Sequence, residues 1–184
     1  MTKDSTSSLF DLFAALLEYP SAEMTEQARD CLEQLKPTHP ETAEALEKFV
    51  RKLDQLSIEK MRELYTITFD MQPVCYPYVG YHLFGESYKR GAFMAQLNEA
   101  YHAFDYSAGQ ELPDHLAVIL RFLSLDATNR AGEFCQTLLD HGVQPALEKM
   151  LKVFSEDSEN PYAEFLSALQ LFLVPIPEKE LTHA

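Results

Sequence analysis

Apolar residues recur along most of this chain at the spacing of helices. The clearest case is residues 43–56, where apolar side chains return every three or four positions and so share one helical face. Comparable spacing predicts helices over residues 9–17 and 58–69, and a mostly polar helix over residues 22–35 is expected to lie on the surface. A longer helix is predicted over residues 87–104. Most of the first half of the chain is therefore expected to be helical.

The second half continues this pattern with shorter helices. Gly85 is expected to end a short helix that begins at Tyr78. Two further helices are predicted over residues 132–141 and 145–154, with Gly142 as the break between them, and a strongly apolar last helix over residues 161–174. No segment of four or more residues alternates cleanly between apolar and polar, and neither a heptad pattern nor a repeat of fixed period occurs.

One stretch is apolar on every face of its predicted helix. Residues 116–123 contain a single charge in eight positions, and such a helix belongs in the middle of a domain. Pro113 suits the first helical position, and Asp114 would place a negative charge at the positive end of the helix dipole. With Glu111 and His115, Asp114 forms a polar cluster at the mouth of the most buried helix. We expect the functional site there.

Two irregular connectors flank one helical pair. Residues 70–77 contain two prolines in eight positions, which ordinary helix does not accept, and residues 105–110 contain a glycine. Both connectors are rich in polar and aromatic side chains. Irregular segments of this composition beside a helical pair are typical of a groove that binds a partner peptide.

Arg90 interrupts an apolar stripe. It lies one turn before Met94 on the face of the helix that also carries Leu97 and Tyr101. A charge on an apolar face needs a partner or a route to solvent. The candidate partners are Asp70, Glu111 and Asp114.

These observations predict an all-α protein. We expect a single-domain bundle of roughly eight to ten helices over residues 1–174, followed by a loose C-terminal tail over residues 175–184.

The charge of the chain limits its partners. The formal net charge of −14 disfavours nucleic acids and anionic membrane surfaces, whose binding relies on clustered Lys and Arg, and it is compatible with a basic protein partner. The three cysteines form no C-x-x-C pair, which argues against disulfides and a zinc site. The N-terminus is polar, and Asp11 interrupts the first apolar run. We therefore expect neither a signal peptide nor a membrane-spanning helix. We expect a cytoplasmic protein without direct membrane insertion.

Catalytic signatures are missing from the sequence. It contains no G-x-S-x-G, no P-loop and no glycine-rich dinucleotide turn. Glu99 and His102 have the Glu-x-x-His spacing of a di-iron site, but no second copy accompanies them. Carboxylates and a histidine at a helix start, as in residues 111–115, are more often capping groups than metal ligands. We therefore predict no catalytic residues, no metal and no cofactor.

Each candidate residue also has an ordinary structural explanation. Tyr65 and Phe69 are by default core packing, Arg90 an internal ion pair, and His115 a hydrogen-bonded residue at a helix start. The remaining aromatic candidates are by default a loop covering the core: Tyr76, Tyr78 and Tyr81.

Several motifs together resemble one known family. The helix end Tyr-x-x-Thr-Phe-Asp at residues 65–70, the Lys-Arg-Gly helix start at 89–91 and the Glu-Leu-Pro-Asp-His stretch at 111–115 are similar to those of respiratory nitrate reductase assembly chaperones. These belong to the wider TorD, DmsD and NarJ family of redox-enzyme maturation chaperones. The helix pattern extends the resemblance over roughly residues 9–173.

The resemblance implies an all-α, non-catalytic chaperone. Its partner would be the catalytic subunit of a molybdoenzyme, a nitrate reductase or another member of the dimethyl sulfoxide reductase family. The chaperone would bind the subunit's N-terminal or twin-arginine-like segment until molybdenum cofactor and Fe–S clusters are inserted. With our own candidates, the expected client-peptide site comprises Tyr65, Phe69, Asp70, Tyr76, Tyr81, Arg90, Glu111, Pro113, Asp114 and His115.

In this hypothesis the carboxylates at 70, 111 and 114 meet Lys or Arg of the client, and the aromatic side chains receive its apolar face. Two alternatives remain open: a general helical scaffold with a different client, and a metal- or nucleotide-dependent enzyme. The protein is expected to be a monomer or a domain-swapped dimer, with the links at 105–110 and 155–160 as hinges.

Overall fold

The computed structural model describes residues 3–175 and contains ten continuous helical segments and no strand within them. The predicted all-α fold is confirmed. In chain order the elements, with η for π-helical turns, are α1 (Ser5–Leu16), α2 (Met24–Leu35), α3 (Pro40–Asp54), α4 (Ile58–Tyr65), η1 (Thr66–Asp70), α5 (Val79–Phe84), α6 (Tyr88–Ala103), α7 (Leu116–Leu123), α8 (Ala127–Ala131), α9 (Glu133–Thr137), η2 (Leu138–Val143), α10 (Gln144–Leu151) and α11 (Pro161–Phe172).

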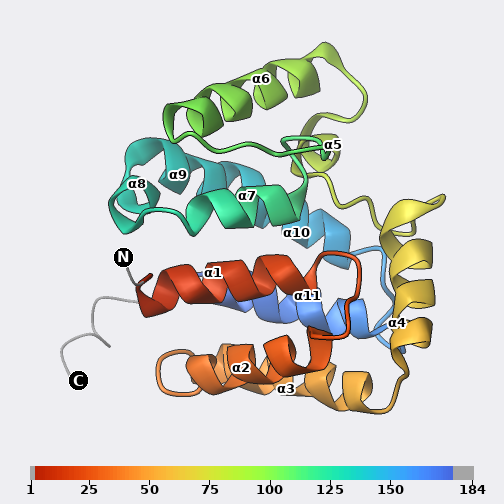
Figure 1. Ribbon diagram of the computed structural model, residues 1–184. Helices are drawn as coiled ribbons and strands as arrows, with labels where there is room; N and C mark the ends of the chain where they lie inside the picture. Colours follow the sequence, from red (N-terminus) through yellow and green to blue (C-terminus); the bar gives the residue numbers. More distant parts are fainter. Residues whose placement is uncertain (1–2, 176–184) are drawn as a thin grey trace.

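The helices stack in layers around α1 and α11. Helix α1 packs against both α2 and α7, and α11 packs along α3. Figure 1 shows α2 and α3 on one side of this central pair and α7 to α10 on the other. Helix α4 runs across one end of the layers, and α6 is the outermost helix, next to α5.

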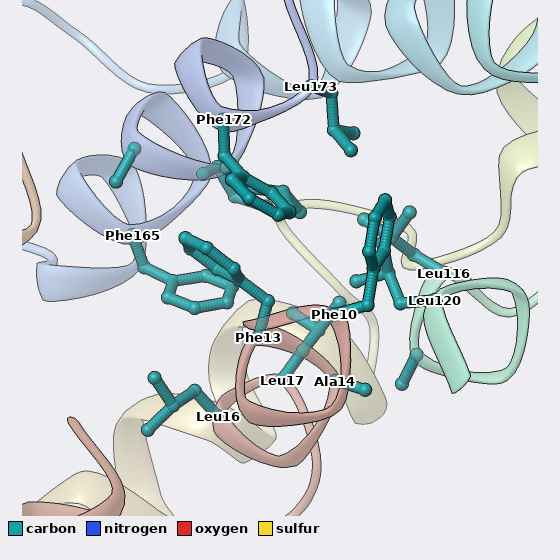
Figure 2. Packing of buried hydrophobic residues seen from close by; sticks show 14 of the residues in the cluster. Phe10, Phe13, Ala14, Leu16, Leu17, Leu116, Leu120, Phe165, Phe172 and Leu173 are labelled. Atoms are coloured by element: carbon teal, nitrogen blue, oxygen red, sulfur yellow. The ribbon is translucent and has the colours of Figure 1, made fainter. Parts of the chain in front are cut away.

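Aromatic side chains join α1 to α11 in the core. Phe13 is fully buried and stacks on Phe172 with ring centroids 4.9 Å apart, and its ring lies 5.8 Å from that of Phe165. Figure 2 shows Phe10 of α1 next to Leu116 and Leu120 of α7. All residues of α7 except Arg121 are buried. The prediction that this apolar stretch is a central helix is confirmed.

Helix α7 begins later than the sequence suggested. His115 is its N-cap residue and the first helical residue is Leu116, so the placement of Pro113 at the first helical position is wrong. The reason is tertiary pairing: Leu116 N–H donates to the carbonyl oxygen of Pro77 (2.9 Å), and Val79 N–H donates to that of Asp114 (2.8 Å). The backbone before α7 is thereby held extended against the connector before α5.

Two π-helical turns alter the expected helix boundaries. Turn η1 continues α4 as far as Asp70, and η2 joins α9 to α10 into one continuous helix. The prediction that Gly142 breaks the chain into two helices is therefore wrong, because the wider turn of η2 contains the glycine. Gly85 does end α5, with a positive φ of 61°.

The two connectors predicted at 70–77 and 105–110 are irregular except for Asp70, which is the last residue of η1. The non-helical segments extend over residues 71–78 and 104–115. No helix among residues 3–175 is long and apolar enough to cross a membrane. The tail predicted to be loose lies, from residue 176 on, outside the described residues.

Candidate functional site

A buried ion pair lies at the centre of the candidate site. Asp114 precedes α7 and its side chain is completely buried, whereas Arg90, in the first turn of α6, is 17% exposed. Arg90 donates from Nε to Asp114 Oδ2 (2.9 Å) and from Nη2 to Oδ1 (3.3 Å). Of the three partners considered for Arg90, the structure selects Asp114.

This pairing corrects one part of the sequence interpretation. Asp114 was expected to present its carboxylate to the Lys or Arg of a client. A carboxylate without solvent access, bound at both oxygens by one guanidinium, is instead an internal counter-ion. Its place is beneath the surface, where it fixes the position of Arg90.

Tyr78 connects the ion pair to Glu111. The Arg90 guanidinium lies over the Tyr78 ring, 5.3 Å from its centroid, and the Tyr78 hydroxyl donates to Glu111 Oε1 (3.1 Å). Burial, together with the negative charge of Glu111, raises the pKa of Tyr78 to about 12, so the hydroxyl remains a donor at neutral pH. Sequence reasoning grouped Tyr78 with its neighbours and left it out of the site.

A glycine allows α5 to approach the ion pair. A Cβ atom at Gly80 would lie 2.6 Å from Asp114 Oδ2 and 2.9 Å from Cδ1 of Phe93. Neither distance is possible without a shift of these atoms. Gly80 was not among the predicted site residues, because an apolar-periodicity argument gives a single glycine in a short helix no special meaning.

Gly80→Ala is expected to lower the free energy of unfolding by about 1–3 kcal/mol, as overpacking of a well-packed region does. Gly91→Ala in α6 is the matched control, because nothing lies within 4 Å of its added Cβ. There the change should be neutral or stabilising by about 0.5–1 kcal/mol. Urea unfolding measures both. Equal effects of the two substitutions would show that the close approach at Gly80 has no energetic consequence.

His115 caps α7 with its side chain. Its Nδ1 accepts a hydrogen bond from Ala117 N–H (3.1 Å), and its ring lies edge-on to that of Tyr78. Burial lowers the pKa of His115, and the nearby carboxylates of Glu111 and Asp114 only partly oppose this. The imidazole is therefore neutral in the folded protein, and its Nδ1 carries no proton, as a hydrogen-bond acceptor requires.

The lowered pKa of His115 predicts a loss of stability in acid. The unfolded chain takes up the proton near pH 6.5, before the folded protein does, so the free energy of unfolding falls as the pH decreases below 7. Unfolding titrations at several pH values between 7 and 5 should show a smaller decline for His115→Asn, since asparagine is a good N-cap and does not titrate. Identical declines in the two proteins would contradict this assignment.

The aromatic residues at the end of α4 belong mainly to the core. Phe69 is buried, with its ring 4.8 Å from that of Tyr162, as the default interpretation predicted. Tyr65 is partly exposed and packs edge-on against Tyr19 (5.6 Å). Burial first, then the negative charges of Glu111 and Asp70, raises the pKa of Tyr65 to about 12.

Tyr76 and Tyr81 form a second aromatic pair at the surface. Their ring centroids are 4.1 Å apart, and Tyr76 is 38% exposed. His82 Nε2 donates to the carbonyl oxygen of Tyr76 (2.6 Å), which ties the connector to α5. Pro113 is buried, and its carbonyl oxygen accepts a hydrogen bond from the Tyr101 hydroxyl (2.7 Å).

The structure thus brings most of the predicted residues together. They lie around η1 at the C-terminal end of α4, helix α5, the first turn of α6 and the segment before α7. The structure also adds an apolar surface that sequence reasoning missed, formed by exposed side chains next to Asp70. These are Ile67, Met71 and Val74, of which Met71 is 73% exposed. Their exposure has no sequence signal, because apolar residues at a helix end or in a connector are expected to point inward.

Candidate metal ligands do not gather in the described part of the chain. Among residues 3–175, no three His, Cys, Asp or Glu side chains lie close enough together to hold a metal ion. Glu99 and His102 are both exposed on α6.

Comparison with known proteins identifies the class. Residues 32–168 match the family described as nitrate reductase delta subunit. The chain belongs to this family, which is a family of maturation chaperones and not of catalytic enzymes. The resemblance noted from the motifs is thereby confirmed.

A solved structure shares the fold. The crystal structure of a proposed redox enzyme maturation protein from Archaeoglobus fulgidus superposes with a TM-score of 0.63 at 24% sequence identity, over 91% of this chain and 93% of that chain. No curated protein matches the sequence.

Proposed function

We propose that this protein is a system-specific assembly chaperone for a molybdoenzyme. In the cytoplasm it binds the N-terminal segment of the apo catalytic subunit and holds the subunit until molybdenum cofactor and Fe–S clusters are inserted, before membrane attachment or twin-arginine export. Membership of the nitrate reductase delta subunit family supports the class of partner. The site supports the mode of binding.

The observation that carries the proposal is an exposed apolar surface bordered by carboxylates. Ile67 of η1 is exposed, as are Met71 and Tyr76 of the connector that follows it. Asp70 and Glu111 are exposed carboxylates, and their negative charges add to the effect of burial in raising the pKa of Tyr65. A segment that is basic near its start and then apolar is complementary to such a surface in both charge and hydrophobicity.

The site residues divide into two roles in this proposal. Those with exposed atoms contact the client: Tyr65, Asp70, Tyr76, Tyr81 and Glu111. Those that are mainly buried hold the contact residues in position: Phe69, Arg90, Pro113, Asp114 and His115.

Calorimetric titration with a synthetic peptide tests this division. The peptide comprises the N-terminal ~30 residues of a candidate molybdoenzyme subunit from the same genome, enough for an extended basic start and a helix of several turns. Asp70→Asn and Glu111→Gln should each weaken binding by about two- to fivefold, the effect of an exposed ion pair. Glu44→Gln, an exposed carboxylate on α3, is the control and should leave the affinity unchanged.

Salt should weaken the wild-type complex and reduce the difference between wild type and the two site variants. An affinity that does not change between low and moderate ionic strength would contradict the role of the carboxylates. A complete failure of the folded wild-type protein to bind the peptide would contradict recognition of the N-terminal segment.

A further inference from the structure

A second apolar surface lies away from the candidate site. A pocket of ≈ 250 Å³ is lined by Phe84 and Phe93 on one side and Leu138 of η2 on the other. A second pocket of ≈ 460 Å³ adjoins it. Both pockets are lined by Gln96 of α6 and Phe134 of α9, so they form one continuous groove between α6 and the α9–η2 helix.

The groove exists because α6 is attached to the rest of the protein along only part of its surface. Only Leu97 and Tyr101 of its sixteen residues are buried, and its main packing partner is the short helix α5. Beyond this contact, Phe84 remains 37% and Phe134 43% exposed. Exposed aromatic side chains that line a concave surface are typical of an interaction site.

The walls of the groove suit a helix. Ala100 and Ala103 face the second pocket, and such small side chains leave room for another backbone to approach α6. The opposite wall includes η2, and π-helical turns inside longer helices are frequent at functional sites. The aromatic side chain of Phe134 stands between the two pockets, where it can insert between the side chains of an incoming helix.

The charge of the groove and of the whole chain indicates which kind of helix would bind there. Among residues 3–175, Glu99 is the only Asp, Glu, Lys or Arg that lines either pocket, and the whole chain carries a net charge of −14. A second copy of the chain would therefore meet like charge. We propose that this groove is a docking site for an amphipathic helix of another protein, with its apolar face over Phe93 and Phe134 and a Lys or Arg opposite Glu99.

The groove and the candidate site use different side chains of the same two helices. In α6, Arg90 belongs to the candidate site while Gln96 and Glu99 line the groove. In α5, Tyr81 pairs with Tyr76 while Phe84 lines the groove. The inference does not depend on the proposed function, because it rests on other side chains.

Two synthetic helical peptides of about 18 residues, five turns, serve as probes. Both carry leucine along one face; the other face carries lysine in one peptide and glutamate in the second. Calorimetry with the full chain should detect binding of the lysine peptide alone. Gln96→Arg, which places a positive charge in the groove, should weaken this binding about tenfold. Ala95→Arg makes the same change of charge on the adjacent exposed residue outside both pockets and should have little effect.

Each opposing outcome is distinct. Equal weakening by the two arginine variants would show attraction to the acidic surface without a groove, and equal binding of the two peptides would overturn the charge assignment. Weakening by Tyr76→Ala, with Gln96→Arg unchanged, would place the peptide at the candidate site. Light scattering tests the alternative occupant, a second copy of this chain. If the wild type self-associates and Gln96→Arg abolishes the self-association, the groove binds a second copy. Urea unfolding confirms that the variants compared are folded.

Discussion

Replacing Arg90 with methionine is expected to lower the free energy of unfolding by about 3–5 kcal/mol, the usual cost of leaving one member of a buried ion pair without its partner. The carboxylate of Asp114 has no solvent access and receives both of its side-chain hydrogen bonds from Arg90. Methionine fills much of the volume of the arginine stem but offers no donor. Urea unfolding at neutral pH measures the effect.

The two partners should differ in their sensitivity. Arg90 is 17% exposed and can move its guanidinium toward water when Asp114 is changed, so Asp114→Asn should cost less than Arg90→Met. The double variant Arg90→Met with Asp114→Leu removes both charges and should recover most of the loss. A double variant as unstable as Arg90→Met alone would show that shape, and not charge, determines the stability here.

The same substitutions bear on the candidate site. Arg90 packs over Tyr78, and Tyr78 in turn donates to Glu111, an expected contact residue. Loss of Arg90 is therefore expected to weaken binding of the client peptide even under conditions where the variant is fully folded. The asparagine variant, in which Arg90 retains one acceptor oxygen at residue 114, should bind the peptide nearly as well as the wild type.

Local sequence was sufficient to predict the helices that pack by one regular face. The three- and four-residue spacing over 43–56 predicted α3, and the unbroken apolar run at 116–123 predicted the burial of α7. The mismatch of Arg90 with its apolar stripe predicted that this charge needs a partner or a route to solvent, and Asp114 is that partner. In each case one short segment contains the whole physical cause.

Features that depend on distant segments could not be predicted in this way. The start of α7 is set by hydrogen bonds from Val79 and Leu116 across the connector before α5, so Pro113 lies outside the helix despite its favourable propensity. The need for glycine at position 80 follows only from the approach of Asp114. Which of three carboxylates lies beneath the surface is likewise a property of the packed chain, and the sequence-based hypothesis had placed all three at the rim.

Phe13→Ala is expected to lower the free energy of unfolding by about 3–5 kcal/mol through loss of buried surface and the cavity that remains. Phe13 is completely buried in α1, and its ring packs against Phe165 and Phe172 of α11, so the substitution empties the contact between the two central helices. Phe13→Leu retains most of the apolar volume and should cost clearly less. Urea unfolding compares the two variants, and equal losses would mean that the side chains around Phe13 close the cavity.

This prediction complements the one for Arg90, because it separates stability from recognition. None of the aromatic partners of Phe13 is a candidate site residue. The folded fraction of Phe13→Ala should therefore bind the client peptide with the affinity of the wild type, whereas Arg90→Met should bind more weakly under conditions where it is fully folded. Similar affinities for Phe13→Ala and Arg90→Met, both weaker than the wild type, would show that recognition depends on the stability of the whole bundle and not on the local network of Arg90, Tyr78 and Glu111.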